Sequence, residues 1–85
     1  MQVMAVSTIS DEARFWSGLK KAYGRLPNGA RWTLAVASTD GAKAVNIVAH
    51  DSVDAVRRFF EEHTGSSATT EYFEADAANA VGLAK

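Results

Sequence analysis

The sequence predicts an α+β domain whose elements follow the order strand, helix, strand, strand, helix, strand. Segments with the two-residue periodicity of strands alternate with two segments whose apolar residues recur at helical spacing. A turn sequence, Asp40-Gly41, divides the central segment into two facing strands. The chain has 85 residues, so we expect one domain over residues 1–85, since chains divide into several cores only at larger sizes.

The first strand and the first helix are predicted within residues 2–26. Residues 2–9 alternate loosely and neither parity is strongly polar, a pattern typical of an inner strand. Ser10 is expected to cap the helix, because a serine side chain accepts a hydrogen bond from a free N–H at a helix start. The helix ends at Pro27-Asn28-Gly29, which turns the chain. The apolar arc of this helix contains Phe15, Trp16, Leu19, Ala22, Tyr23 and Leu26.

Residues 31–50 predict a β-hairpin about Asp40-Gly41. If these two residues form the loop, residues whose numbers sum to 81 face each other. This register separates an apolar side from a small, half-polar side, and we expect the apolar side to face the core. The apolar side comprises Trp32, Leu34, Val36, Val45, Ile47 and Ala49, and the half-polar side comprises Arg31, Thr33, Ala35, Ala37, Ala44, Asn46, Val48 and His50.

A second amphipathic helix is predicted after the hairpin. Asp51 or Ser52 is expected to cap it, with an acidic residue in its first turn. Its apolar arc includes His63, which we expect to pack at the helix end and to donate toward the last carbonyls. Gly65 is expected to end the helix in the left-handed conformation.

The fourth strand is predicted over residues 68–75. Tyr72 and Phe73 lie on opposite sides of that strand. Asp76 is then expected to cap one final turn over residues 77–81.

This order of elements is the split βαβ arrangement of ferredoxin-like folds, a four-stranded antiparallel sheet with two helices on one face. The other face is left uncovered, and we expect Tyr72, with Met4 or Val6, to join the half-polar side of the hairpin there. A domain of this size buries only ~60% of its unfolded-chain surface. We therefore expect a homodimer packed sheet to sheet through the uncovered face.

The layout resembles the dimeric α+β barrel group of ferredoxin-like domains over most of the chain. Residues 71–83, Glu-Tyr-Phe-Glu-Ala-Asp-Ala-Ala-Asn-Ala-Val-Gly-Leu, resemble a tail found in small uncharacterised bacterial proteins. Relatives in the barrel group include cofactor-free monooxygenases, isomerases and small-ligand binders. None of their catalytic motifs matches this chain residue by residue, so the resemblance carries over no site.

Composition argues against several classes of function. The absence of cysteine excludes disulfide frameworks, thiolate nucleophiles and cysteine zinc sites. The net charge of −1 provides no field that would attract nucleic acid or an anionic membrane. No apolar run approaches the ~20 residues of a membrane span and no leader is recognised, so we expect a cytoplasmic protein. We also expect no cofactor.

His50 is the leading candidate for a catalytic residue. An imidazole changes charge near neutral pH, and the neighbouring Asp51 can orient it as a general base. Arg31 lies opposite His50 in the predicted register, and either Asn46 or Arg31 would stabilise an enolate-like anion. The alternative is a semi-exposed histidine at the edge of the sheet. We expect no metal, because His50 and His63 have no third ligand.

Four aromatic residues are candidates for ligand binding, namely Trp16, Tyr23, Trp32 and Tyr72. Aromatic side chains so placed line a pocket between helix and sheet that an apolar ligand enters, or they fill the core. The first hypothesis is a non-catalytic homodimeric domain that binds a small apolar molecule. The alternatives are a cofactor-independent monooxygenase- or isomerase-like enzyme with His50 as base, and a pure protein-interaction module.

Overall fold

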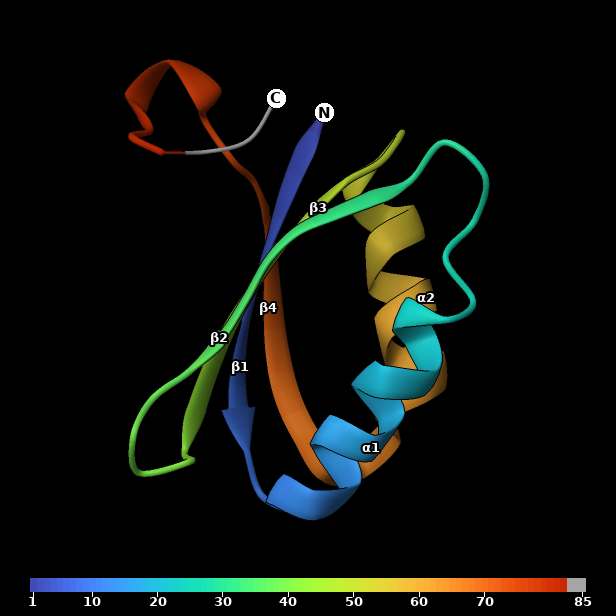
Figure 1. Cartoon of the computed structure of the whole chain (residues 1–85), viewed down its shortest axis with the longest axis vertical. Coiled ribbons are helices and arrows are strands. Elements are labelled where there is room, and N and C mark those ends of the chain that lie inside the picture. The colour runs from blue at the N-terminus through green and yellow to red at the C-terminus, as the bar shows by residue number, and fades with distance from the viewer. Residues whose placement is uncertain (83–85) are drawn as a thin grey trace.

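Two helices pack on one face of a four-stranded antiparallel sheet (Figure 1). The computed structural model describes residues 1–82; Leu83 of the tail lies outside the described residues. The strand order is β2-β3-β1-β4, so β1 lies inside the sheet as predicted, and the order of elements fits a βαββαβ fold. The elements are β1 (Gln2–Ile9), α1 (Glu12–Tyr23), β2 (Arg31–Ala37), β3 (Lys43–Ala49), α2 (Val53–Thr64) and β4 (Ala68–Glu74).

The start of α1 differs from the prediction. Asp11 caps the helix, its carboxylate accepting a hydrogen bond from the Arg14 backbone N–H at 3.1 Å. Ser10 donates its hydroxyl to the carbonyls of Ser66 and Ser67 instead. Ser10 therefore ties the start of α1 to the 3₁₀ turn η1 (Gly65–Ser67) that precedes β4.

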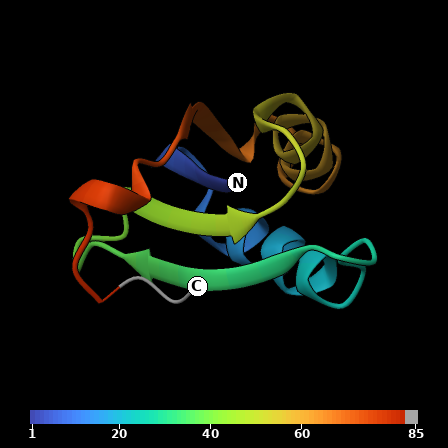
Figure 2. The same ribbon diagram turned by 90° about the horizontal axis from the view of Figure 1, so that it is seen from above.

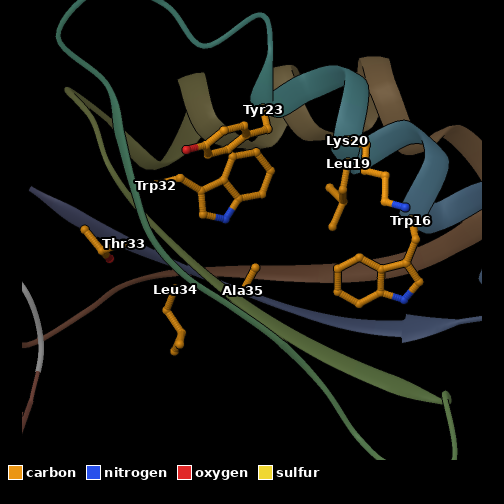
Figure 3. Close-up of a pocket in the computed structure, with 8 residues that line it drawn as sticks. All are labelled: Trp16, Leu19, Lys20, Tyr23, Trp32, Thr33, Leu34 and Ala35. Carbon is orange, nitrogen blue, oxygen red and sulfur yellow. The ribbon is translucent and has the colours of Figure 1, made fainter.

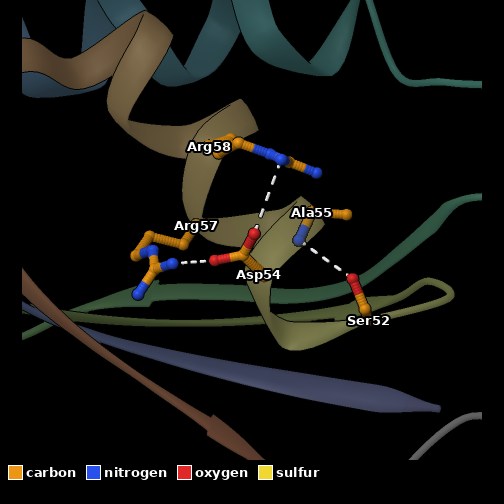
Figure 4. A network of polar contacts seen from close by, with 5 residues as sticks. All are labelled: Ser52, Asp54, Ala55, Arg57 and Arg58. Atoms are coloured by element: carbon orange, nitrogen blue, oxygen red, sulfur yellow. Dashed lines mark hydrogen bonds and ion pairs between the residues drawn. The ribbon is translucent and has the colours of Figure 1, made fainter.

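The N-cap of α2 agrees with the prediction. Ser52, one of the two candidates, accepts a hydrogen bond from the Ala55 N–H at 3.0 Å (Figure 4). Asp54 in the first turn forms ion pairs with Arg57 and Arg58 on the exposed side of the helix. Because these pairs are exposed, they contribute little to stability. Gly65 follows the helix as predicted and has a positive φ of 53°, but its ψ of −132° differs from the predicted left-handed helical conformation.

The predicted hairpin register holds only near the turn. Residues from Leu34 to Ala37 have the expected partners on β3. A β-bulge between Trp32 and Leu34 then shifts the register, so that Trp32 pairs with Val48, and Arg31 pairs with Ala49 rather than His50. The loop is also longer than two residues, because β2 ends at Ala37 and β3 begins at Lys43.

The predicted assignment of the two hairpin faces is wrong. Ala44, Asn46 and Val48 are buried under the helices, whereas Leu34 and Val36 are 42% and 50% exposed. The reason lies in β1, whose buried residues pair with β3 and fix which side faces the helices. The bulge alone returns Trp32 to the helix side. Residues on the uncovered face include Met4, Val6, Leu34, Val36, Val45, Ile47 and Phe73.

Tyr72 is a second correction. It pairs with Ala5 of β1, which is fully buried, so Tyr72 lies on the helix side rather than on the uncovered face. Its neighbour Phe73 pairs with Met4 and is 45% exposed.

The C-terminal turn lies on the side of the sheet away from the helices (Figures 1 and 2). As predicted, Asp76 caps this turn, η2 (Ala77–Asn79), by accepting a hydrogen bond from the Ala78 N–H at 3.0 Å. The tail borders a groove whose other wall includes Met4, Leu34 and Ile47. It therefore lies beside one part of the uncovered face.

Two buried phenylalanines from the helices and small or medium-sized side chains from the sheet together fill the core. Phe15 of α1 and Phe60 of α2 are completely buried. The buried strand residues include small ones, as at Ala5, Ser7 and Ala44, and the larger Val3 and Val48. Aromatic rings from the helices thus occupy the space between the helices and the sheet.

Among residues 1–82, neither helix has the length and apolar character of a membrane-spanning segment.

The two helices approach each other closely at Gly18. A Cβ atom on Gly18 would overlap the backbone carbonyl of His63 near the end of α2. The absence of a side chain at Gly18 therefore lets α1 lie directly against α2.

Replacing Gly18 with alanine should destabilise the fold by ~1–3 kcal/mol, because the added methyl forces the packed helices apart. Urea denaturation measures this change. Gly24→Ala is the matched control: Gly24 has an ordinary φ of −73°, and the nearest atom to an added Cβ lies at 3.6 Å. Equal stabilities of the Gly18 and Gly24 variants would contradict the role of Gly18.

Candidate ligand-binding site

An open cavity of about 430 Å³ lies between α1 and the edge strand β2 (Figure 3). Its lining comes from only these two elements, and most of it is apolar. Four residues of α1 form one wall, namely Trp16, Leu19, Lys20 and Tyr23, and four residues of β2 form the other, namely Trp32, Thr33, Leu34 and Ala35.

The spacing of residues on α1 accounts for its wall. Positions 16, 19, 20 and 23 are three, four and seven residues apart, which places them on one face of a helix. The same helix lies against α2 through Gly18. Opposite this wall, β2 contributes Ala35, whose single methyl group fills little space. The volume over the edge of the sheet therefore stays partly unfilled.

Trp32 is held from several sides. Its indole Nε1 donates a hydrogen bond to Oδ1 of the buried Asn46 at 3.1 Å. Its ring centroid lies 5.2 Å from that of Phe60 and 6.0 Å from that of Tyr23. The bulge brings the side chain to the helix side, and these three contacts then fix the orientation of the indole. Trp32 therefore forms a defined wall of the cavity.

Two polar side chains interrupt the apolar lining. The hydroxyl of Thr33 donates to the carbonyl oxygen of Ile47 at 3.2 Å, so its hydrogen is already used within the sheet. Lys20 is exposed, and its side chain extends beside Leu19 toward Trp16 (Figure 3). The ammonium group of Lys20 is thus placed at the mouth of the cavity.

Three of the four predicted ligand-binding residues come together here. Trp16, Tyr23 and Trp32 all line the cavity. Tyr72 does not: its ring packs edge to face on Phe60, with centroids 6.2 Å apart, farther into the covered side of the sheet. Sequence reasoning missed Leu19, Lys20, Thr33, Leu34 and Ala35 as lining residues. For Lys20 the signal was present, since it follows Trp16 by four residues on the same helix face.

The candidate catalytic residues do not form one cluster. Asn46 is buried on the covered side and is bonded to Trp32. Arg31 pairs with Ala49, whose side of β3 belongs to the uncovered face. His50 follows β3, and its Nδ1 accepts a hydrogen bond from the backbone N–H of Asp51 at 2.6 Å. The backbone amide, rather than the carboxylate, is thus what orients this ring. A general-base role for His50 stays a prediction.

His63 packs at the end of α2 as predicted. Its ring lies 4.8 Å from the Phe59 ring, and its Nδ1 is 2.8 Å from the Phe59 carbonyl oxygen. Within residues 1–82, no three His, Asp or Glu residues are grouped so that they could hold a metal ion.

Comparisons of the chain with protein-family models, with curated proteins and with solved structures give no match. The resemblance to the dimeric α+β barrel group and a bacterial origin therefore stay predictions.

The buried position of Tyr72 gives a prediction for alkaline pH. Burial, with a contribution from the nearby Glu61 carboxylate, raises the pKa of Tyr72 from 10.0 to about 12. The folded state then holds this proton more tightly than the unfolded state does. The free energy of unfolding should fall as pH rises from 10 toward 12.

Urea denaturation of the wild type and of Tyr72→Phe across this pH range isolates the contribution. The variant should lose less stability than the wild type, because it has no phenol to ionise. An identical fall in both proteins would show that Tyr72 ionises as it does in the unfolded chain.

Proposed function

We propose that this protein is a small-ligand-binding domain whose ligand occupies the cavity between α1 and β2. The observation that carries the proposal is the lining, in which Trp16, Tyr23 and Trp32 surround an open volume of about 430 Å³. Ligand sites in proteins are apolar and aromatic hollows of ~300–1,000 Å³ with a few polar groups. The cavity has this size and this chemistry.

The fixed orientation of Trp32 supports the same proposal. A flat ligand gains most from aromatic walls that are already in place, since no side-chain entropy is then lost on binding. The hydrogen bond to Asn46 and the contact with Phe60 hold one such wall. For a bicyclic ligand, ~0.3–0.5 kcal/mol per non-hydrogen atom corresponds to a dissociation constant in the range of roughly 0.1–10 mM.

We also propose that two copies of the chain associate through the uncovered face of the sheet. The middle of this face is apolar, and it includes Leu34, Val36 and Phe73 among the exposed large side chains. Charges of both signs, Lys43 and Glu71, lie on the same face. In a dimer with a two-fold axis, the same face of each copy packs against that of the other. A face with charges of both signs can then place positive residues of one copy against negative residues of the other.

The ligand proposal is tested by NMR titration of the full chain with indole, a neutral bicyclic probe. Amide resonances of residues 16–23 and 31–36 should shift at millimolar indole. Ala35→Phe should weaken binding at least about fivefold, because the added ring occupies the cavity. Ala37→Phe, two residues along the same side of β2 and outside the lining, is the matched control. Absence of shifts in the wild type, or equal binding by both variants, would refute the ligand site.

The association proposal is tested by light scattering at micromolar concentration. The wild type should show twice the 9.1 kDa of a single chain. Val36→Glu places a charge on the uncovered face and should yield the single-chain mass, because an unpaired buried charge is costly. Ala37→Glu adds the same charge to the other side of β2 and should leave the mass unchanged. A wild type of single-chain mass would contradict association through this face.

A further inference from the structure

Lys20 is the only charged residue among those that line the cavity between α1 and β2. Within residues 1–82, the ion pairs join Asp54 to Arg57 and Arg58, so no carboxylate neutralises Lys20. Its position four residues after Trp16 and three before Tyr23 puts it on the helix face that forms the cavity wall. The cavity therefore combines aromatic walls with one positive charge that has no protein partner.

The segment of the chain that contains the cavity-lining residues has an excess of basic side chains. Residues 13–39, which include most of α1 and all of β2, contain five Lys or Arg and no Asp or Glu. The whole chain nevertheless has a net charge of −1. The local excess of positive charge thus lies on the two elements that build the cavity, and Lys20 is the member that lines it. The basic residues of this stretch are Arg14, Lys20, Lys21, Arg25 and Arg31.

We propose that the ligand is a planar aromatic or apolar molecule that carries one carboxylate. Its ring lies against the indoles of Trp16 and Trp32, and its carboxylate accepts a hydrogen bond from the ammonium group of Lys20. This inference rests on the proposed ligand-binding function and adds the charge and the orientation of the ligand.

A carboxylate fits this position better than a phosphate does. Proteins bind phosphate dianions through several backbone N–H groups, through bidentate arginine side chains or at the N-terminal end of a helix. Here the cavity lies along the C-terminal half of α1, where the helix dipole is negative. The lining contributes a single amine and no arginine. The single positive charge of Lys20 therefore balances one monovalent anion.

The test compares two probes that differ in charge and hardly at all in shape, indole-3-acetate and indole-3-acetamide. NMR titration of the full chain at low salt gives the dissociation constant of each. Because the ion pair is exposed, the wild type should prefer the acetate by roughly twofold to fivefold. Lys20→Gln should abolish this preference while it still binds the acetamide. Lys21→Gln, which removes a neighbouring charge outside this cavity, should retain it.

The outcomes separate this inference from the function on which it rests. If the acetamide binds in the cavity but the acetate binds no better, the ligand site stands and the carboxylate proposal is overturned. The same holds if Lys20→Gln keeps the full preference. If neither probe shifts the resonances of α1 and β2, the ligand site itself fails, and the carboxylate proposal fails with it.

Discussion

The close contact of α1 with α2 at Gly18 is the constraint on which the rest of the molecule depends. Because no side chain separates Gly18 from the His63 carbonyl, α1 lies directly beside α2 on one face of the sheet (Figure 1). The edge strand β2 is then covered by side chains that reach out from α1 and, at Trp32, by Phe60 of α2. The cavity is therefore a consequence of helix packing, and its walls are the aromatic residues that span the remaining distance.

The second determinant is local and lies in β2. A bulge at one point of a strand changes the side to which the following residues point. Here it brings Trp32 to the covered side, where Asn46 accepts its indole hydrogen bond. Asn46 is thus a buried polar residue whose side-chain oxygen orients Trp32, one wall of the cavity. A residue that sequence reasoning considered for anion stabilisation has this structural role.

Sequence patterns predicted the kind and order of the elements well, because helical and strand periodicities are local properties. Ser52, Gly65 and Asp76 were correctly predicted as helix-end residues for the same reason. The faces of the hairpin were not predicted, since both sides of β3 are largely apolar and alternation alone does not say which side meets the helices. Pairing with β1 decides this, because the buried residues of β1 lie next to Ala44, Asn46 and Val48 and so place that side of β3 under the helices. Trp16 and Tyr23 were found from helical spacing, and Trp32 was found as an aromatic residue at the start of a strand. The place of Trp32 in the cavity depends on a bulge that no sequence signal indicated.

The bulge in β2 also affects how the edge of the sheet meets other chains. An edge strand presents unpaired backbone N–H and C=O groups, and a long regular one is a template for uncontrolled pairing and fibril growth. On β2 the regular register runs only from Leu34 to Ala37 before the irregularity interrupts it. An incoming strand could therefore pair regularly with these few residues and would lose its register at the bulge. The bulge thus limits how far another strand can pair with an edge that lacks proline and lysine.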